Sequence, residues 1–317
     1  MQNTDIDALY QSLVAQLSRQ RLIDWTRALI EIPSVNPFDA EPAPGQREQE
    51  IAHYYRDQLE LLGVTATVRE AAPGRPNVWG SLKGGAPGKT LMLSGHLDTV
   101  GVEGYSAPFD ACERDDRLYG RGSCDMKAAL AAYLEVARLL AGVRDQLHGE
   151  LLITGVADEE YRMLGSKDFG ARGPFADYCI IGEPSSLQVC PAHKGQFSLF
   201  IRTFGTAVHS SVPSEGVNAI EKMGKVIEAF ADYNQQLSQG CRHTLCGHGS
   251  FSPGVIRGGD IVSTVPDFCE LEVDRRILPN ESKADILAEY RRKLDAIAQT
   301  DPDFRYEISA PSWDVGA

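Results

Sequence analysis

The stretch LMLSGHLD, residues 91–98, decides the class of fold, because an apolar run of strand length ends directly in an imidazole and a carboxylate. Further short apolar runs, which we expect to be strands, occupy residues 64–68, 77–82, 151–156 and 178–181. Apolar side chains at helical spacing predict helices over residues 5–32, 47–62 and 126–141. Buried strands that alternate with helices predict an α/β fold, with a mostly parallel or mixed central sheet flanked by helices.

The second half of the chain has a different order of elements. We expect a strand, a helix, two strands, a helix and a strand, over residues 197–204, 216–237, 254–256, 268–277, 282–298 and 304–308. This βαββαβ order is that of the ferredoxin-like fold. We therefore predict a first domain over residues 1–194, an inserted domain over residues 195–310 and a return to the first domain from residue 311 to residue 317.

The composition argues against several classes of protein. The chain has 317 residues, with 31 Lys and Arg against 44 Asp and Glu, a net charge of −13. Nucleic acid and anionic membranes repel such a protein, so we expect neither as a partner. No apolar run approaches the roughly 20 residues that span a bilayer, and no signal-peptide pattern is visible. The seven cysteines lack the spacing of a disulfide framework, so we expect a cytoplasmic protein with reduced thiols.

Acidic and imidazole side chains collect where the predicted strands end. They are His96 and Asp98 after the first strand quoted, Asp125 before the helix at 126–141, Glu159 and Glu160 after residues 151–156, and Glu183 after residues 178–181. In an open α/β sheet such strand ends share one edge, where ligands bind. Clustered carboxylates raise one another's pKa, and a divalent cation such as Zn²⁺, Co²⁺ or Mn²⁺ removes that cost. The alternative is a set of unrelated helix caps and solvated loop acids.

The adjacent pair Glu159 and Glu160 indicates hydrolysis. Neighbouring residues at a strand end point in different directions, so one carboxylate can bind a metal while the other faces the substrate. A free carboxylate beside a metal-activated water can act as a general base. Asp98, two residues beyond His96, can hold that imidazole in one tautomer.

Four strings carry a resemblance to a known family, namely SGHLDTV at residues 94–100, YGRGSCDMK at 119–127, DEE at 158–160 and GEPS at 182–185. In order and spacing they resemble the M20 family of metal-dependent amidohydrolases and peptidases, over nearly the whole chain. The resemblance implies that His96, Asp125 and Glu183 hold one metal ion. It also implies that Asp125 bridges to a second ion bound by Glu160, and that Glu159 is the general base. The expected ions are two Zn²⁺, with Co²⁺ as a substitute.

Within this family the chain most resembles the acetylornithine deacetylase and succinyl-diaminopimelate desuccinylase group, through residues 180–188, 192–195 and 216–221. That likeness implies a cytoplasmic enzyme of arginine biosynthesis that cleaves the amide bond of a small N-acyl amino acid. It also implies a homodimer formed by the inserted domain, in which His209 reaches the partner's site to stabilise the oxyanion. Arg276 would bind the substrate carboxylate, and Ser263 stands where the family commonly has an Asn that helps to bind it.

The resemblance leaves alternatives open. Family members continue beyond the inserted domain and supply a late His to the second metal, whereas this sequence stops at Ala317. We therefore expect a C-terminally truncated chain whose second metal site is weak. Such a chain is either an active deacetylase or an impaired fragment that keeps dimerisation and one metal site. Within the hydrolases, the alternative is a dipeptidase or carboxypeptidase that uses the same metals on a larger substrate.

Overall fold

The computed structural model describes residues 3–38, 40 and 48–310 of the chain. The chain divides into two compact units, Met1–Gln188 and Val189–Ala317. The division falls a few residues before the boundary predicted after residue 194. The return expected over residues 311–317 lies outside the described residues.

The N-terminal region forms two helices, α1 (Asn3–Val14) and α2 (Arg19–Glu31), so the single helix predicted over residues 5–32 was wrong. Ser18 has an extended backbone, and its hydroxyl accepts a hydrogen bond from the N–H of Arg21, as an N-cap does. The N–H of Ser18 donates to the carboxylate of Glu135, far along the sequence. A tertiary partner therefore stabilises the break between the two helices.

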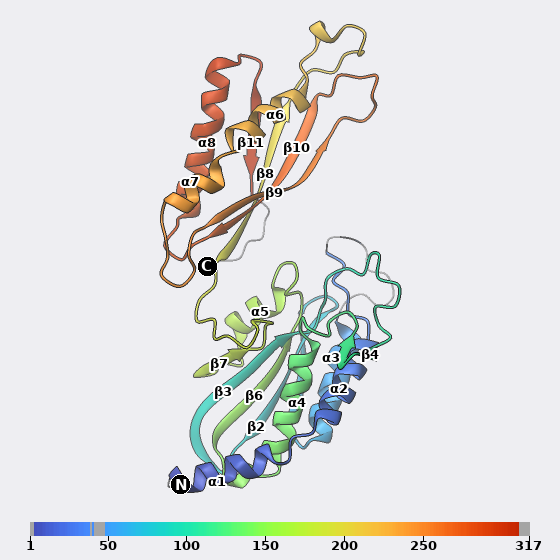
Figure 1. Ribbon diagram of the computed structural model, residues 1–317, viewed down its shortest axis with the longest axis vertical. Coiled ribbons are helices and arrows are strands. Elements are labelled where there is room, and N and C mark those ends of the chain that lie inside the picture. Colours follow the sequence, from blue (N-terminus) through green and yellow to red (C-terminus); the bar gives the residue numbers. More distant parts are fainter. Residues whose placement is uncertain (1–2, 39, 41–47, 311–317) are drawn as a thin grey trace. The chain divides into compact units, whose positions relative to one another are not determined.

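The first unit is built on a five-stranded mixed sheet (Figure 1). Its strands, in spatial order, are β1 (Thr65–Ala72), β2 (Arg75–Lys83), β6 (His148–Val156), β3 (Ala86–His96) and β7 (Tyr178–Ile181). The neighbours β6, β3 and β7 run parallel, whereas β1 and β2 are antiparallel to their neighbours. The predicted mixed α/β fold is thus confirmed. A short hairpin, β4 (Cys112–Arg114) and β5 (Arg117–Tyr119), stands apart from this sheet.

Helices cover both faces of the sheet. On one face, α3 (Gln49–Leu61) and α4 (Lys127–Ala141) pack on the strands and α2 packs on α4 (Figure 1). Tyr55, Val78 and Leu130 are fully buried in this layer. On the opposite face, α5 (Leu164–Arg172) contacts β1 and β2, and its Phe169 meets Trp79 edge-on at 5.8 Å. The period-two alternation of a strand places Val78 and Trp79 on opposite faces.

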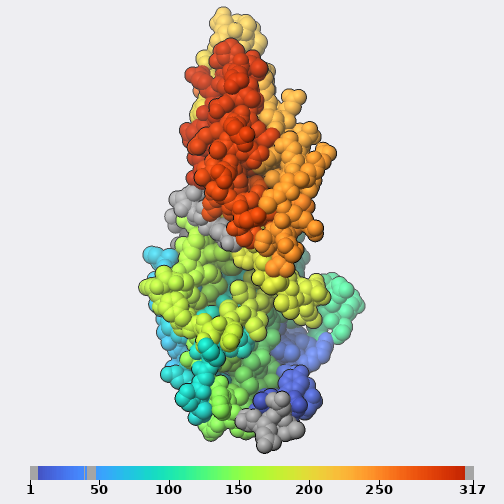
Figure 2. Space-filling view, turned by 90° about the vertical axis from the view of Figure 1, so that its left-hand side faces the viewer, coloured from blue at the N-terminus to red at the C-terminus, as the bar shows by residue number. Residues whose placement is uncertain are grey.

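The second unit has a four-stranded antiparallel sheet. Its strands, in spatial order, are β11 (Arg305–Ser309), β8 (Gly195–Phe204), β10 (Phe268–Ile277) and β9 (Ser250–Gly258). In chain order this is 4-1-3-2. With α6 (Ala219–Ala229) between the first two strands and α8 (Lys283–Thr300) between the last two, this is the predicted ferredoxin-like arrangement. The outer side of α8 forms part of the surface of this unit, red in Figure 2.

The helix predicted over residues 216–237 is instead α6 followed by α7 (Tyr233–Gln239). The break brings the rings of Phe230 and Tyr233 into one buried aromatic cluster with Phe251 and Tyr290. Aromatic burial and edge-to-face packing outweigh the continuation of a regular helix here.

No helix among the described residues combines the length and apolar character that a membrane crossing requires.

Candidate metal centre

Sheet register brings the polar strand ends together. His96, the last residue of β3, pairs with Val156, the last residue of β6, and Ser94 pairs with Ile181, the last residue of β7. Because the three strands are parallel neighbours, the segments that follow them leave from the same edge. Glu159 and Glu160 therefore follow β6 at this edge, and Glu183 follows β7.

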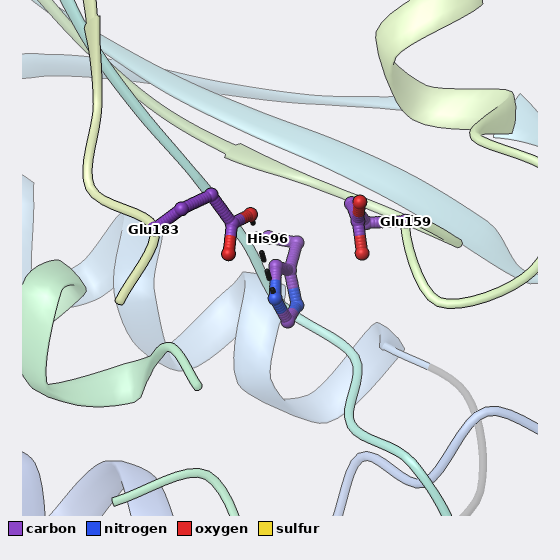
Figure 3. Close-up of side chains that lie close together, drawn as sticks. All are labelled: His96, Glu159 and Glu183. Carbon is purple, nitrogen blue, oxygen red and sulfur yellow. Dashed lines mark ion pairs between the residues drawn. The ribbon is translucent and has the colours of Figure 1, made fainter. Parts of the chain in front are cut away.

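The side chains converge on the imidazole of His96. Its Nε2 lies 2.9 Å from Oδ1 of Asp125 and 3.9 Å from Oε1 of Glu183. Two groups of residues could each hold a metal ion, because within each group the candidate ligand atoms all lie within 4.8 Å of one another. One group is His96, Asp125 and Glu160, and the other is His96, Glu159 and Glu183. Figure 3 shows the second group, with the carboxylates of Glu159 and Glu183 on either side of the ring.

The backbone of Asp98 orients His96. Nδ1 of the ring lies 2.8 Å from the backbone carbonyl oxygen of Asp98, so Nδ1 carries the proton and donates it. This contact leaves Nε2 to face the carboxylates. The Asp98 side chain, which the sequence predicts to hold the ring, forms a longer ion pair with it, with Oδ1 3.7 Å from Nδ1. That carboxylate also accepts the backbone N–H groups of Glu159, at 3.0 Å, and of Glu160, at 3.1 Å.

The electrostatics of the cluster show a surplus of negative charge. Burial raises the pKa of Glu159 and of Glu160 to about 7, against the opposing effect of His96. Burial also raises the pKa of Glu183. Burial alone lowers the pKa of His96, but the hydrogen bond with Asp125 and the surrounding carboxylates outweigh it and raise that pKa to about 10. The same hydrogen bond lowers the pKa of Asp125.

These residues fit a divalent cation. One imidazole nitrogen and several carboxylate oxygens form the ligand set that Zn²⁺, Co²⁺ or Mn²⁺ accepts, without a thiolate. Carboxylates whose pKa is raised by burial and mutual repulsion gain most from a nearby positive charge. The ring of His96 is 1% exposed and fixed through Nδ1, which is how proteins commonly orient a histidine ligand.

Sequence reasoning missed a set of buried polar residues behind this edge, namely Asn36, Glu48, Arg75 and Asp158. Asn36 donates to both Asp98 and Asp158, and Arg75 forms ion pairs with Asp158 and Glu48. Only Asp158 lies in a stretch that the motifs single out. The others are separated from it in sequence and carry no local pattern, so no sequence signal marked them.

The other predicted site residues belong to the second unit. His209 and Ser263 lie in neighbouring exposed loops, because His209 forms a bridge with Thr264 and the N–H of Ser210 donates to the carbonyl of Ser263. Nδ1 of His209 accepts the N–H of Ser211 at 3.2 Å, so the neutral ring presents Nε2–H as a donor. Arg276 lies on β10, where it pairs with Asp274 at 3.1 Å.

Comparison with known proteins agrees with the family resemblance of the sequence motifs. A family model described as "Peptidase family M20/M25/M40" matches residues 92–309. An acetylornithine deacetylase from Vibrio vulnificus is 36% identical over 271 residues, which are 82% of this chain and 69% of that protein.

Solved structures share the fold. A tripeptidase from Staphylococcus aureus matches with a TM-score of 0.68 at 21% identity, over 93% of this chain and 76% of its own. A dinuclear metal-binding peptidase of the M20 family from Bacillus subtilis matches with a TM-score of 0.63 at 18% identity, over 93% of this chain and 74% of its own. At these sequence identities the two structures are evidence for a shared fold only.

Proposed function

This chain belongs to peptidase family M20/M25/M40, and from that premise we propose that it is a metal-dependent hydrolase of small N-acyl amino acids, with N-acetylornithine as the first substrate to test. One observation carries the chemistry: the ligand atoms of Glu159 lie within 4.8 Å of those of His96 and Glu183, and His96 also groups with Asp125 and Glu160, so Glu159 can serve as the base while the other carboxylates bind the metal. The relative from Vibrio vulnificus, which is named a deacetylase, supports this choice of substrate over a dipeptide.

His96, Asp125, Glu160 and Glu183 would hold the metal, with Zn²⁺ expected and Co²⁺ as a substitute. When bound, a divalent cation supplies a Lewis acid that polarises the amide carbonyl and makes water more acidic. Glu159 then accepts a proton from the attacking water and donates it to the nitrogen of the leaving amine.

The second unit would complete the site. In this proposal the protein is a cytoplasmic homodimer, and His209 of one protomer donates Nε2–H to the oxyanion formed at the other protomer's site. The guanidinium of Arg276 binds the substrate carboxylate through two parallel hydrogen bonds. Ser263 lies in the loop beside His209, where its hydroxyl is available for a further hydrogen bond to the substrate.

The decisive experiment measures release of the free amine from N-acetylornithine by protein loaded with Zn²⁺ or Co²⁺. Glu159→Gln keeps the size of the side chain but removes the base, and should lower kcat by about 10²–10⁴. Glu60→Gln, at an exposed position on α3, is the matched control and should keep normal turnover.

Near-normal turnover by Glu159→Gln would place the base elsewhere. Turnover of dipeptides without turnover of N-acetylornithine would favour the peptidase alternative.

A further inference from the structure

Asn36 is buried directly behind the Glu159–Glu160 pair, with 1% of its surface exposed. Its side-chain nitrogen donates to Oδ2 of Asp98 at 2.7 Å and to Oδ1 of Asp158 at 3.0 Å. Its side-chain oxygen accepts the N–H of Phe38 at 2.8 Å, which fixes which end of the amide faces the carboxylates. One amide group thus joins two acidic residues that are distant in sequence.

Both acidic residues contact the segment that carries the pair. Asp98 accepts the backbone N–H groups of Glu159 and Glu160. Asp158 precedes Glu159 and has a left-handed backbone with φ of 62°, which an Asp tolerates better than most residues. The direction of both glutamate side chains therefore depends on where the Asp98 carboxylate lies and on the backbone turn at Asp158.

The carboxylates need a donor between them. Asp98 and Asp158 are both buried and contact the same nitrogen of Asn36, so without that donor two desolvated acids would face each other. Arg75 neutralises part of this charge, but it ion-pairs with Asp158 and Glu48 rather than with Asp98. The hydrogen bond from Asn36 is thus the side-chain donor to Asp98, and it reaches Oδ2, the oxygen that also accepts the N–H of Glu160. Hydrogen bonds to ionised groups are about twice as strong as neutral ones.

We infer that Asn36 is a positioning residue for the Glu159–Glu160 pair. It fixes the carboxylates of Asp98 and Asp158, and Asp98 in turn fixes the backbone from which the two glutamates project. The catalytic consequence rests on the proposed function, whereas the structural consequence does not.

The test measures hydrogen exchange of the Glu159 and Glu160 amides by NMR in metal-free protein, where neither metal nor activity enters. In Asn36→Ala the Asp98 carboxylate loses its side-chain amide donor and keeps the N–H groups of Glu159 and Glu160. Both amides should then exchange faster by about tenfold, as expected when a charged hydrogen bond is weakened. Asn36→Ser leaves a smaller cavity and should show the same change if Asn36→Ala does not fold.

Ser34→Ala is the matched control. Ser34 lies two residues away, is also fully buried, and donates its hydroxyl to the carbonyl of Leu97 at 2.7 Å without touching Asp98 or Asp158. Its removal should leave the Glu159 and Glu160 amides at the wild-type rate. Unchanged exchange in the Asn36 variants, or equal acceleration in Ser34→Ala, would overturn the inference.

A second measurement separates positioning from stability. If the wild-type protein hydrolyses N-acetylornithine, Asn36→Ala should lower kcat by roughly tenfold or more with KM little changed, because a misplaced base affects the transition state and not substrate binding. A rise in KM at constant kcat would contradict this role. Absence of hydrolysis in the wild-type protein would count against the proposed function alone, since the exchange result stands independently.

Discussion

His209 and Arg276 lie at opposite ends of the sheet of the second unit. His209 follows β8 and bridges to Thr264, just before the start of β10 at Phe268, whereas Arg276 lies near the end of β10 and pairs with Gln196 at the start of β8. Eight residue-to-residue steps of extended strand lead from Phe268 to Arg276, a span of about 26 Å. A small amino acid cannot contact both side chains of one protomer, so the proposed roles require two chains at each site.

Mixing two inactive variants tests this consequence. His209→Ala and Glu159→Gln should each hydrolyse N-acetylornithine poorly, and together they should recover up to about a quarter of the wild-type rate when subunits exchange. Recovery occurs because one site of the mixed dimer receives an intact Glu159 and an intact His209 from different chains. Glu159→Gln mixed with itself is the control. No recovery under proven subunit exchange, or a monomer in sedimentation, would exclude the role in trans.

Metal binding should depend on pH through His96. The metal-free site raises the pKa of His96 to about 10, so the ring is protonated at neutral pH and must lose its Nε2 proton to become a ligand. The apparent affinity for Co²⁺ should therefore rise with pH by about tenfold per unit between pH 8 and 9, and more steeply below pH 7, where the ligand Glu160, with a pKa of about 7, must also lose a proton.

Calorimetry in two buffers of different ionisation enthalpy measures the protons released on binding. His96→Ala should abolish tight binding, whereas His53→Ala, at an exposed position on α3, should not. Affinity that does not change with pH would show that His96 is not a ligand.

The ion pairs of Glu135 should stabilise the first unit above pH 4.5. Its carboxylate contacts Arg21 and Arg138 at 2.8–3.1 Å. Burial acts to raise the pKa of Glu135, but the two guanidinium groups outweigh it and lower that pKa from 4.5 to about 2. A lowered pKa means that the stabilisation is present above the unfolded value and is lost as the pH falls towards 2.

Glu135→Gln should thus cost about 2 kcal/mol at pH 7 and progressively less towards pH 3. Urea denaturation at each pH measures the difference, with Glu60→Gln as an exposed control. A cost that stays constant across this range would assign the effect to packing.

Lys127 should be important for the stability of the first unit. Its ammonium group is fully buried and donates to the carbonyl oxygens of Leu29 at 2.9 Å and Ile32 at 2.8 Å, at the C-terminal end of α2. Lys127→Met fills similar space but leaves both carbonyls without this donor, and should lower the free energy of unfolding by about 1–3 kcal/mol. Thermal denaturation checks this, with exposed Lys83→Met as the control. Equal stability of the two variants would show that water replaces the ammonium group.

The sequence by itself determined the class of fold and the position of the polar cluster. Strand and helix identity follow from short-range periodicity, and the 4-1-3-2 order of the second unit follows from the βαββαβ succession. The proximity of His96, Glu160 and Glu183 was predictable because parallel strand ends share one edge, whereas the assignment of these residues and Asp125 as one ligand set came from the family resemblance. These features depend on the local pattern and on a general rule of topology.

The tertiary structure alone decided the rest. Ser18 breaks the first helix because Glu135 lies beside its N–H, and Phe230 breaks another because its ring packs on Tyr290. The Asp98 carboxylate forms its hydrogen bonds with the Glu159 backbone and with Asn36, a residue distant in sequence, and only the backbone carbonyl of Asp98 hydrogen-bonds the imidazole of His96. In each case a buried polar group or ring is satisfied by a partner distant in sequence, and satisfying such groups contributes more free energy than local propensity does.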